Sequence, residues 1–276
     1  MDTRPIGVFD SGLGGLTAVR KIMQYLPNED VVYFGDTGRV PYGTRGESVI
    51  RSYAEQDSRF LLNYDVKFII AACGTVSSVA PDILESLPVP AIGVVKPTAS
   101  AAAKTTKNGK IGILGTSATI QSRSFEKALQ SENPSIQVFP QACPLFIPLV
   151  ENGWIMKNDP VTTLTVERYL APIKEAGVDT VILGCTHFPI LADFISEYLG
   201  PSVALIDAGN EAAKACMNEL QKHDLCGSDT IGCCRYFVSD HPRDFANIAE
   251  IFLGRPVHQT VEIVDISQLD KEKSCK

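Results

Sequence analysis

The stretch VILGCTHFPI, residues 181–190, places a thiol, a hydroxyl and an imidazole directly after a run of apolar residues. A short apolar run of this kind is typical of a buried strand. Earlier in the chain FIIAACGT, residues 68–75, has a similar form, with an apolar run followed by a cysteine and, two positions later, a threonine. Two strands that end in similar polar residues indicate that the chain repeats a structural unit.

Other predicted strands support this repeat because their partners follow in the same order at nearly the same spacing. The matched pairs are 6–8 with 111–113 (111 − 6 = 105), 69–75 with 181–186 (185 − 73 = 112), and 92–95 with 204–207 at about the same spacing. Each match alone is weak, since apolar strand ends look alike, but the ordered set favours two homologous units in tandem.

Short apolar runs alternate with helical patterns along the chain, which is typical of an α/β fold with a mainly parallel sheet. The predicted strands are 6–10, 31–36, 68–73, 91–95, 110–115, 181–185 and 203–207. We therefore expect two similar, open, mainly parallel α/β domains related by pseudo-symmetry. Ligands of such sheets bind at the carboxyl ends of the strands, so the active site is expected in the cleft between the domains.

The repeat also predicts the domain boundaries. We expect a discontinuous first domain from residues 1–97 plus 208–276, and a second domain from residues 98–207. A further strand and helix, at 235–240 and 241–254, are left over and are expected to complete the sheet of the first domain.

Composition limits the possible partners and compartment. A net charge of −7 and a pI near 5.2 give no electrostatic reason to expect nucleic acid or an anionic membrane as a partner. The sequence shows no signal peptide and no apolar stretch long enough for a membrane helix, so we expect a cytoplasmic protein with reduced thiols. None of the eight cysteines has metal-type spacing, and most are expected to be small buried residues.

Cys73 and Cys185 are different, because matched strand ends would bring them to one cleft from opposite sides. A thiolate could remove a proton from one face of a small carbon acid while a thiol returns a proton to the other face. Asp10, at the end of the first strand, is a candidate to assist Cys73, and His187 is a candidate to assist Cys185. The alternative is that both cysteines only fill space.

Three further segments allow two interpretations each. DSGLGGLT, residues 10–17, resembles a dinucleotide-binding turn, but Thr17 stands in place of the third glycine. We interpret it as a tight turn that presents Asp10, Ser11 and backbone donors to a small anion. The loop 39–45 is either a surface turn or a cover over the cleft, and Glu151 is either a helix-end charge or a site carboxylate.

With these residues assembled, the chain closely resembles the glutamate racemases of the cofactor-independent aspartate/glutamate racemase superfamily. The resemblance runs from residue 6 to about residue 255. It rests on GVFDSGLGGLT, GDTGRVPYG, AACGTVSS, CPLFIPLVENG, ILGCTHFPIL, LIDAGNEAA and DFANIAEIFLG. Relatives that act on aspartate or hydantoins carry an acidic residue at the position of His187, so the resemblance favours glutamate.

The resemblance implies interconversion of L- and D-glutamate to supply D-glutamate for peptidoglycan, with no cofactor or metal and with a homodimer as the assembly. It implies that Cys73 removes the α-proton from the D-enantiomer and Cys185 from the L-enantiomer, assisted by Asp10, His187 and Glu151. The positions that match substrate contacts are Asp10, Ser11, Pro41, Tyr42, Gly43, Gly74, Thr75 and Thr186.

One residue departs from the family pattern. Gly74 stands where the family usually has an asparagine that is expected to hydrogen-bond the substrate. Losing such a donor costs about 1–3 kcal/mol if its partner stays buried and unpaired. Two alternatives to a glutamate racemase therefore stay open: a racemase of another acidic amino acid such as aspartate, and a non-catalytic amino-acid-binding regulatory protein.

Overall fold

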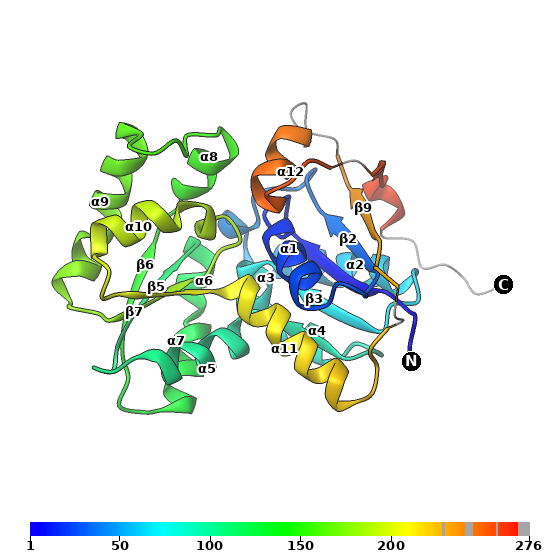
Figure 1. The fold of residues 1–276 in the computed structure, drawn as a ribbon, viewed down its shortest axis with the longest axis horizontal. Coiled ribbons are helices and arrows are strands. Elements are labelled where there is room, and N and C mark those ends of the chain that lie inside the picture. Colours follow the sequence, from blue (N-terminus) through cyan, green and yellow to red (C-terminus); the bar gives the residue numbers. More distant parts are fainter. Residues whose placement is uncertain (228–229, 241–244, 258, 270–276) are drawn as a thin grey trace.

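The computed structural model describes residues 1–227, 230–240, 245–257 and 259–269. Its strands form two parallel sheets, which lie in two lobes side by side (Figure 1). We call them the first and second lobes. The mixed α/β fold with two mainly parallel sheets is the predicted one.

Within the described residues, the first lobe contains six strands in the order β10-β9-β2-β1-β3-β4, all paired in parallel. They are β1 (Ile6–Asp10), β2 (Val31–Gly35), β3 (Phe68–Ala71), β4 (Ala91–Gly93), β9 (Cys234–Val238) and β10 (Val261–Ile263). The pairing of β9 with β2 confirms that the late strand joins the first sheet. The helix after it, α12, is described as Phe245–Leu253, and residues 241–244 of the predicted helix lie outside the described residues.

In the part of the chain that the structure describes, the second lobe contains four parallel strands in the order β6-β5-β7-β8. They are β5 (Lys110–Gly115), β6 (Gln137–Ala142), β7 (Thr180–Leu183) and β8 (Ala204–Asp207). This order has the same pattern as β2-β1-β3-β4 in the first lobe, which supports the tandem repeat. In both lobes the first strand of the repeat lies in the middle of the sheet, next to the strand that leads to a cysteine.

The register of the two sheets agrees with the repeat for two of the three predicted matches. Ile6 pairs with Phe68, and the equivalent Ile111 pairs with Thr180. The third match needs a correction, because Ile69 pairs with Ala91 whereas Val181 pairs with Leu205. The strands β4 and β8 are therefore offset by 205 − 91 = 114 positions rather than 112. The connections before these strands differ in length, and sequence similarity alone misplaced the match by two residues.

Helices cover both faces of each sheet, which explains why nearly all residues of β1, β2, β3 and β7 are buried. In the first lobe α1 (Leu16–Tyr25), α11 (Ala208–Lys222) and α12 pack together, while α2 (Glu47–Leu62), α3 (Gly74–Val79) and α4 (Pro81–Glu85) form a second group. In the second lobe the helices are α5 (Val95–Thr105), α6 (Ser117–Ser122), α7 (Ser124–Glu132), α8 (Phe146–Glu151), α9 (Pro160–Glu175) and α10 (Ala192–Leu199). Helix α11 also contacts α5, so it connects the two lobes (Figure 1).

All strands of the first sheet lie within residues 6–93 and 234–263, and all strands of the second lie within 110–207. On this basis we propose two domains divided near the predicted boundaries of 97/98 and 207/208, the first of which falls within the first turn of α5. Two strands, β6 and β10, were not predicted. Both are edge strands, and β6 contains Pro140 and is only partly buried, so neither shows the continuous apolar run that marks the central strands.

Candidate active site

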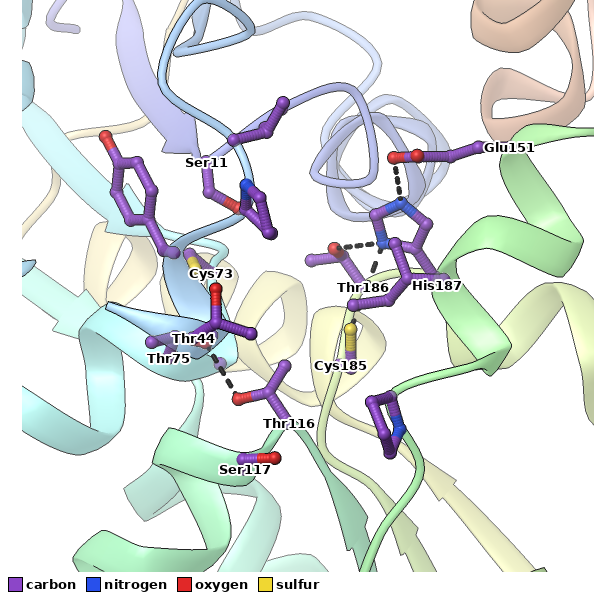
Figure 2. Close-up of a pocket in the computed structure, with 18 of the residues that line it drawn as sticks. Ser11, Thr44, Cys73, Thr75, Thr116, Ser117, Glu151, Cys185, Thr186 and His187 are labelled. Atoms are coloured by element: carbon purple, nitrogen blue, oxygen red, sulfur yellow. Dashed lines mark hydrogen bonds and ion pairs between the residues drawn. The ribbon is translucent and has the colours of Figure 1, made fainter. Parts of the chain in front are cut away.

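A cavity of about 270 Å³ lies where the two lobes meet (Figure 2). The first lobe contributes residues that follow β1, β2 and β3, and the second lobe contributes residues that follow β5, β6 and β7. The lining residues are Ser11, Gly12, Val40, Pro41, Tyr42, Gly43, Thr44, Cys73, Gly74, Thr75, Thr116, Ser117, Pro144, Ile147, Pro148, Glu151, Cys185, Thr186 and His187. Because the carboxyl ends of parallel strands meet at one edge of a sheet, both sheets direct these segments to the cavity.

The two cysteines occupy equivalent positions in the repeat. Cys73 follows the last residue of β3 by two positions, and Cys185 follows the last residue of β7 by two positions. Both side chains are buried, and they approach the cavity from opposite sides (Figure 2). Cys73 is also the N-cap residue of α3, so its backbone is held by the start of a helix. Each thiol is thus placed by a central strand of its own lobe.

On the side of Cys185, a chain of polar contacts leads from the sulfur to the second lobe's surface. The Cys185 Sγ lies 3.9 Å from His187 Nδ1, and the opposite ring atom Nε2 lies 3.0 Å from Glu151 Oε1. Burial alone disfavours the charged imidazole, but the hydrogen bonds to Cys185 and Glu151 outweigh it and raise the pKa of His187 to about 10. His187 can therefore hold a proton next to the sulfur at neutral pH.

The imidazole is also packed by a residue that the sequence did not single out. Phe252, on α12, meets the His187 ring edge-on with the ring centroids 5.0 Å apart. Phe252 is fully buried. The late helix of the first lobe therefore fixes the position of a site residue in the second lobe, and no spacing in the sequence signals that contact.

On the side of Cys73, the surroundings favour the neutral thiol. Burial raises the pKa of Cys73 to about 12, and the nearby Asp10 carboxylate acts in the same direction. A hydrogen bond from Ser11 and one from the backbone of Val76 oppose these effects without reversing them. Cys73 is thus a proton donor at neutral pH, whereas Cys185 faces a group that stabilises negative charge.

Asp10, the residue predicted to assist Cys73, lies near enough to that thiol to raise its pKa. Its carboxylate is fully buried beneath the turn and does not line the cavity. The turn's own backbone amides bind it, since Gly12 N and Gly15 N donate to Asp10 Oδ2 at 3.2 and 3.0 Å. These donors are therefore used by Asp10 and are not presented to an anion. Burial raises the pKa of Asp10.

The loop 39–45 does cover the cavity, through Val40, Pro41, Tyr42, Gly43 and Thr44. The hydroxyl of Tyr42 contacts Asp36 and, at 2.9 Å, Asp57 Oδ2, so it is engaged away from the cavity. Arg39 joins the same two carboxylates with Nε 2.5 Å from Asp36 and Nη2 3.0 Å from Asp57. We call Asp36, Arg39, Tyr42 and Asp57 the loop anchor.

Hydroxyl groups form much of the remaining polar lining. Thr75 Oγ1 lies 3.0 Å from Thr116 Oγ1, which joins the two lobes, and Thr186 Oγ1 lies 3.3 Å from His187 Nδ1 (Figure 2). Sequence reasoning missed Thr116 and Ser117. The repeat contained the signal that could have found them, because the offset of 105 that relates β1 to β5 carries Ser11 onto Thr116.

These observations determine what the site can do chemically. Across the described ranges, no group of three or more His, Cys, Asp and Glu side chains is arranged to hold a metal ion. The other cysteines that the structure describes do not line the cavity: Cys143, Cys216 and Cys234 are buried as predicted, Cys226 is half-buried, and Cys233 is exposed. Cys275 lies outside the described residues. A cavity between two α/β lobes with one thiol on each side is the arrangement that an isomerase needs in order to exchange a proton between the two faces of a carbon.

Comparison with known proteins identifies the family. The family model described as Asp/Glu/Hydantoin racemase matches residues 16–216. The chain is 42% identical to a glutamate racemase of Geobacter metallireducens over 256 residues, which cover 92% of this chain and 94% of that one. Two solved glutamate racemases are each 37% identical, from Bacillus anthracis (TM-score 0.91, 96% and 99% covered) and from Francisella tularensis with D-glutamate (TM-score 0.90, 98% and 99% covered). This chain belongs to the Asp/Glu/Hydantoin racemase family.

Proposed function

We propose that this protein is a glutamate racemase that interconverts L- and D-glutamate and supplies D-glutamate for peptidoglycan. The observation that carries the proposal is the cavity with Cys73 and Cys185 on its two sides. The substrate class is supported by the relatives, since those compared above are named glutamate racemases and one of them was solved with D-glutamate.

The two sulfurs differ in a way that suits one direction of the reaction in the resting site. With L-glutamate bound, Cys185 as thiolate takes the α-proton, and Cys73 as thiol donates its own proton to the opposite face of Cα. The product is D-glutamate, Cys185 is then a thiol, and Cys73 is a thiolate. The reverse reaction starts from that second state, so no net proton is gained or lost in a turnover.

His187 and Glu151 support the Cys185 side of this cycle. The imidazolium next to the Cys185 sulfur stabilises the thiolate, and Glu151 keeps the imidazole protonated. On the other side, Ser11 and the Val76 amide can hydrogen-bond the sulfur of Cys73 when it carries negative charge. Asp10 acts beneath the turn, where it holds Gly12 and Gly15 and thereby positions Ser11.

The threonine and serine hydroxyls and the loop 39–45 are proposed to bind the polar groups of glutamate. Ser11, Thr75 and Thr186 line the cavity close to the cysteines, and Pro41, Tyr42 and Gly43 cover it. Tyr42 contributes through its ring and backbone, because its hydroxyl is held by the loop anchor.

Two finer assignments belong to the same proposal. The described cysteines form no disulfide, which agrees with a reducing compartment and supports the cytoplasm as the place of action. No helix within the described ranges has the length and apolar character needed to span a membrane.

The family resemblance supports a homodimer. The second lobe has a surface that a second copy could cover, formed by the exposed apolar side chains of Leu145, Trp154, Met156, Val161 and Leu164.

The test of the function is proton exchange at Cα combined with loss of optical activity. L- or D-glutamate incubated with the protein in deuterated water should lose its Cα proton signal and its circular dichroism together. Aspartate is measured in parallel. Turnover of aspartate with none of glutamate would assign the enzyme to a different acidic amino acid, and binding without exchange would make it a non-catalytic protein.

Cys73→Ser and Cys185→Ser test the two-thiol assignment. Each variant should lose racemisation by about 10²–10⁴-fold, because a serine hydroxyl is a far weaker acid than a thiol and cannot serve as the base. Cys226→Ser, a half-buried cysteine outside the cavity, is the control and should keep the wild-type rate. If either cavity variant racemises glutamate as fast as the wild type, the assignment fails.

A further inference from the structure

Gly74 and Gly184 bring the backbones of the two lobes into direct contact beside the two cysteines. Gly74 follows Cys73 and begins α3, and Gly184 precedes Cys185. A Cβ atom built on Gly74 would lie 2.0 Å from the carbonyl oxygen of Gly184 and 3.8 Å from the Cα of Cys185. Real Cβ contacts essentially never fall below 3.0 Å. In this structure a side chain at position 74 would therefore require the two backbones to separate by about 1 Å.

Backbone hydrogen bonds hold each of the two segments to its own lobe. The Gly184 amide donates to the carbonyl of Leu114 at 2.8 Å, which holds Gly184 on β5, and a Cβ on Gly184 would itself meet that carbonyl at 2.8 Å. On the other side, Ser77 N donates to Cys73 O at 3.0 Å and closes the first turn of α3. A larger residue at position 74 would have to push the two lobes apart.

At two other contacts around the cavity, a first-lobe glycine likewise lies so close to the second lobe that a Cβ atom would not fit. A Cβ on Gly43 would lie 2.7 Å from the Cβ of Thr116, and a Cβ on Gly14 would lie 2.3 Å from the Oγ1 of Thr186. Gly14 and Gly43 belong to the first lobe, and Thr116 and Thr186 belong to the second. The lobes thus meet around the cavity through first-lobe glycines. Gly74 is the one of these three that adjoins a cavity cysteine.

We propose that Gly74 is a positioning residue that sets the distance between the Cys73 and Cys185 sulfurs by allowing the lobes to touch. This inference rests on the proposed function, in which both thiols act on one carbon. A proton can be transferred to a carbon only over a short distance, and a misplacement of about 1 Å can cost about 10²-fold in rate. A Cβ at position 74 needs a shift of that size, since 2.0 Å must become at least 3.0 Å.

A rival interpretation predicts the opposite result. If Gly74 only lacks the substrate-binding side chain of the family asparagine, then Gly74→Asn should restore a hydrogen bond and improve catalysis. If Gly74 allows the lobes to touch, then Gly74→Asn and Gly74→Ala should both impair catalysis, although alanine neither adds nor removes a hydrogen-bonding group. The sign of the change in kcat/KM for Gly74→Asn separates the two interpretations.

The experiment compares Gly74→Ala and Gly74→Asn with Gly46→Ala. Gly46 is an exposed glycine with no atom within 4 Å of a built Cβ and with an ordinary extended backbone, so alanine fits there. We expect kcat to fall at least tenfold in both directions for the two Gly74 variants, with a smaller change in KM, and to stay within twofold for Gly46→Ala. Gly74 has no positive φ, so its variants should keep the wild-type circular dichroism and fold.

A second measurement is independent of turnover. Alkylation by iodoacetamide, followed peptide by peptide with mass spectrometry, reports how accessible Cys73 and Cys185 are. Both are buried in the wild type, so opening of the lobes by Gly74→Ala should raise their alkylation rates several-fold, while Cys216 on α11 stays unreactive. The Gly46→Ala control should match the wild type.

The outcomes separate this inference from the function itself. A Gly74→Ala variant with the wild-type kcat, a Gly74→Asn variant with raised kcat/KM, or unchanged alkylation rates would overturn the positioning role. A wild-type protein that does not racemise glutamate would overturn the proposed function instead, and the alkylation rates would still decide whether Gly74 holds the lobes together.

Discussion

His187 shows how two different kinds of contact determine the chemistry of one residue. Its contact to Cys185 is local, because only Thr186 separates the two residues in the sequence. The ring atom Nδ1 lies 3.9 Å from the sulfur. Its contact to Glu151 joins positions 36 residues apart and lies at the end of α8. The local contact follows from the CTH motif, whereas the charge state of the imidazole depends on the distant carboxylate.

Glu151→Gln should lower the pKa of His187 from its value of about 10, because an amide does not stabilise the imidazolium as a carboxylate does. NMR titration of the His187 ring protons measures this directly. Glu219→Gln is the matched control, since Glu219 lies 3.3 Å from the exposed His223 and should leave His187 unchanged. A His187 titration that is the same in Glu151→Gln and in the wild type would show that another group holds the proton.

The same change affects stability with a definite sign. The pKa of His187 is raised in the folded state, from 6.5 to about 10, so its stabilising contribution is complete below pH 6.5 and is lost as the pH rises through 10. The free energy of unfolding of Glu151→Gln should therefore differ most from that of the wild type near pH 6.5, and the difference should shrink toward pH 10.

At the scale of elements, the loop 39–45 depends on a buried polar cluster rather than on apolar packing alone. The side chains of Asp36 and Asp57 are fully buried, and burial together with the charge of Asp36 raises the pKa of Asp57 well above its usual range. One hydroxyl proton of Tyr42 cannot be donated to both carboxylates at once, so Arg39 supplies further donors to Asp36 and Asp57. Ser239, just after β9, donates to Asp36 Oδ1 at 2.7 Å and connects the cluster to the late strand.

Tyr42→Phe should destabilise the protein by about 1–3 kcal/mol, because it removes the hydroxyl from two buried carboxylates. It should also raise KM for glutamate, since the loop held by Tyr42 covers the cavity. Urea unfolding and steady-state kinetics measure the two effects. Tyr53→Phe is the control: its ring packs on Tyr42 with the centroids 5.0 Å apart, and it should change neither quantity as much. Equal effects of both substitutions would argue against the loop anchor.

At the scale of the whole molecule, the cavity exists only because two similar lobes face each other. Each lobe contributes one cysteine and about half of the lining, so a ligand in the cavity contacts both. Helix α11 packs against α1 of the first lobe and α5 of the second, which couples the lobes away from the cavity. A ligand that bridges them should therefore stabilise the entire fold.

L- and D-glutamate should each raise the melting temperature, because a ligand that binds only the folded state adds about 2.7 kcal/mol at a concentration of 100 Kd. Differential scanning fluorimetry at constant ionic strength measures the shift, with aspartate and sodium chloride as controls. Aspartate should shift the melting temperature less than glutamate does at the same concentration. The reverse order would contradict glutamate as the preferred ligand.

Much of the fold and of the site could be predicted because the information was local. The strands with continuous apolar runs were predicted, whereas β6 and β10 were missed because neither has such a run. The pairing of the two cysteines was predicted because the matched strands of the repeat follow in the same order and at nearly the same spacing along the chain. The family and the racemase class followed from ordered motifs, and the comparisons confirmed them.

The sequence by itself therefore determined the α/β class, the tandem repeat and the two strand ends that carry thiols, since each depends on residues that are neighbours along the chain. Only the tertiary structure decided that Asp10 lies beneath its own turn, that Phe252 packs on His187, and that Gly74 touches Gly184. The last two contacts join segments far apart in the sequence. They depend on how two lobes meet in space, which no periodicity or spacing along one chain encodes.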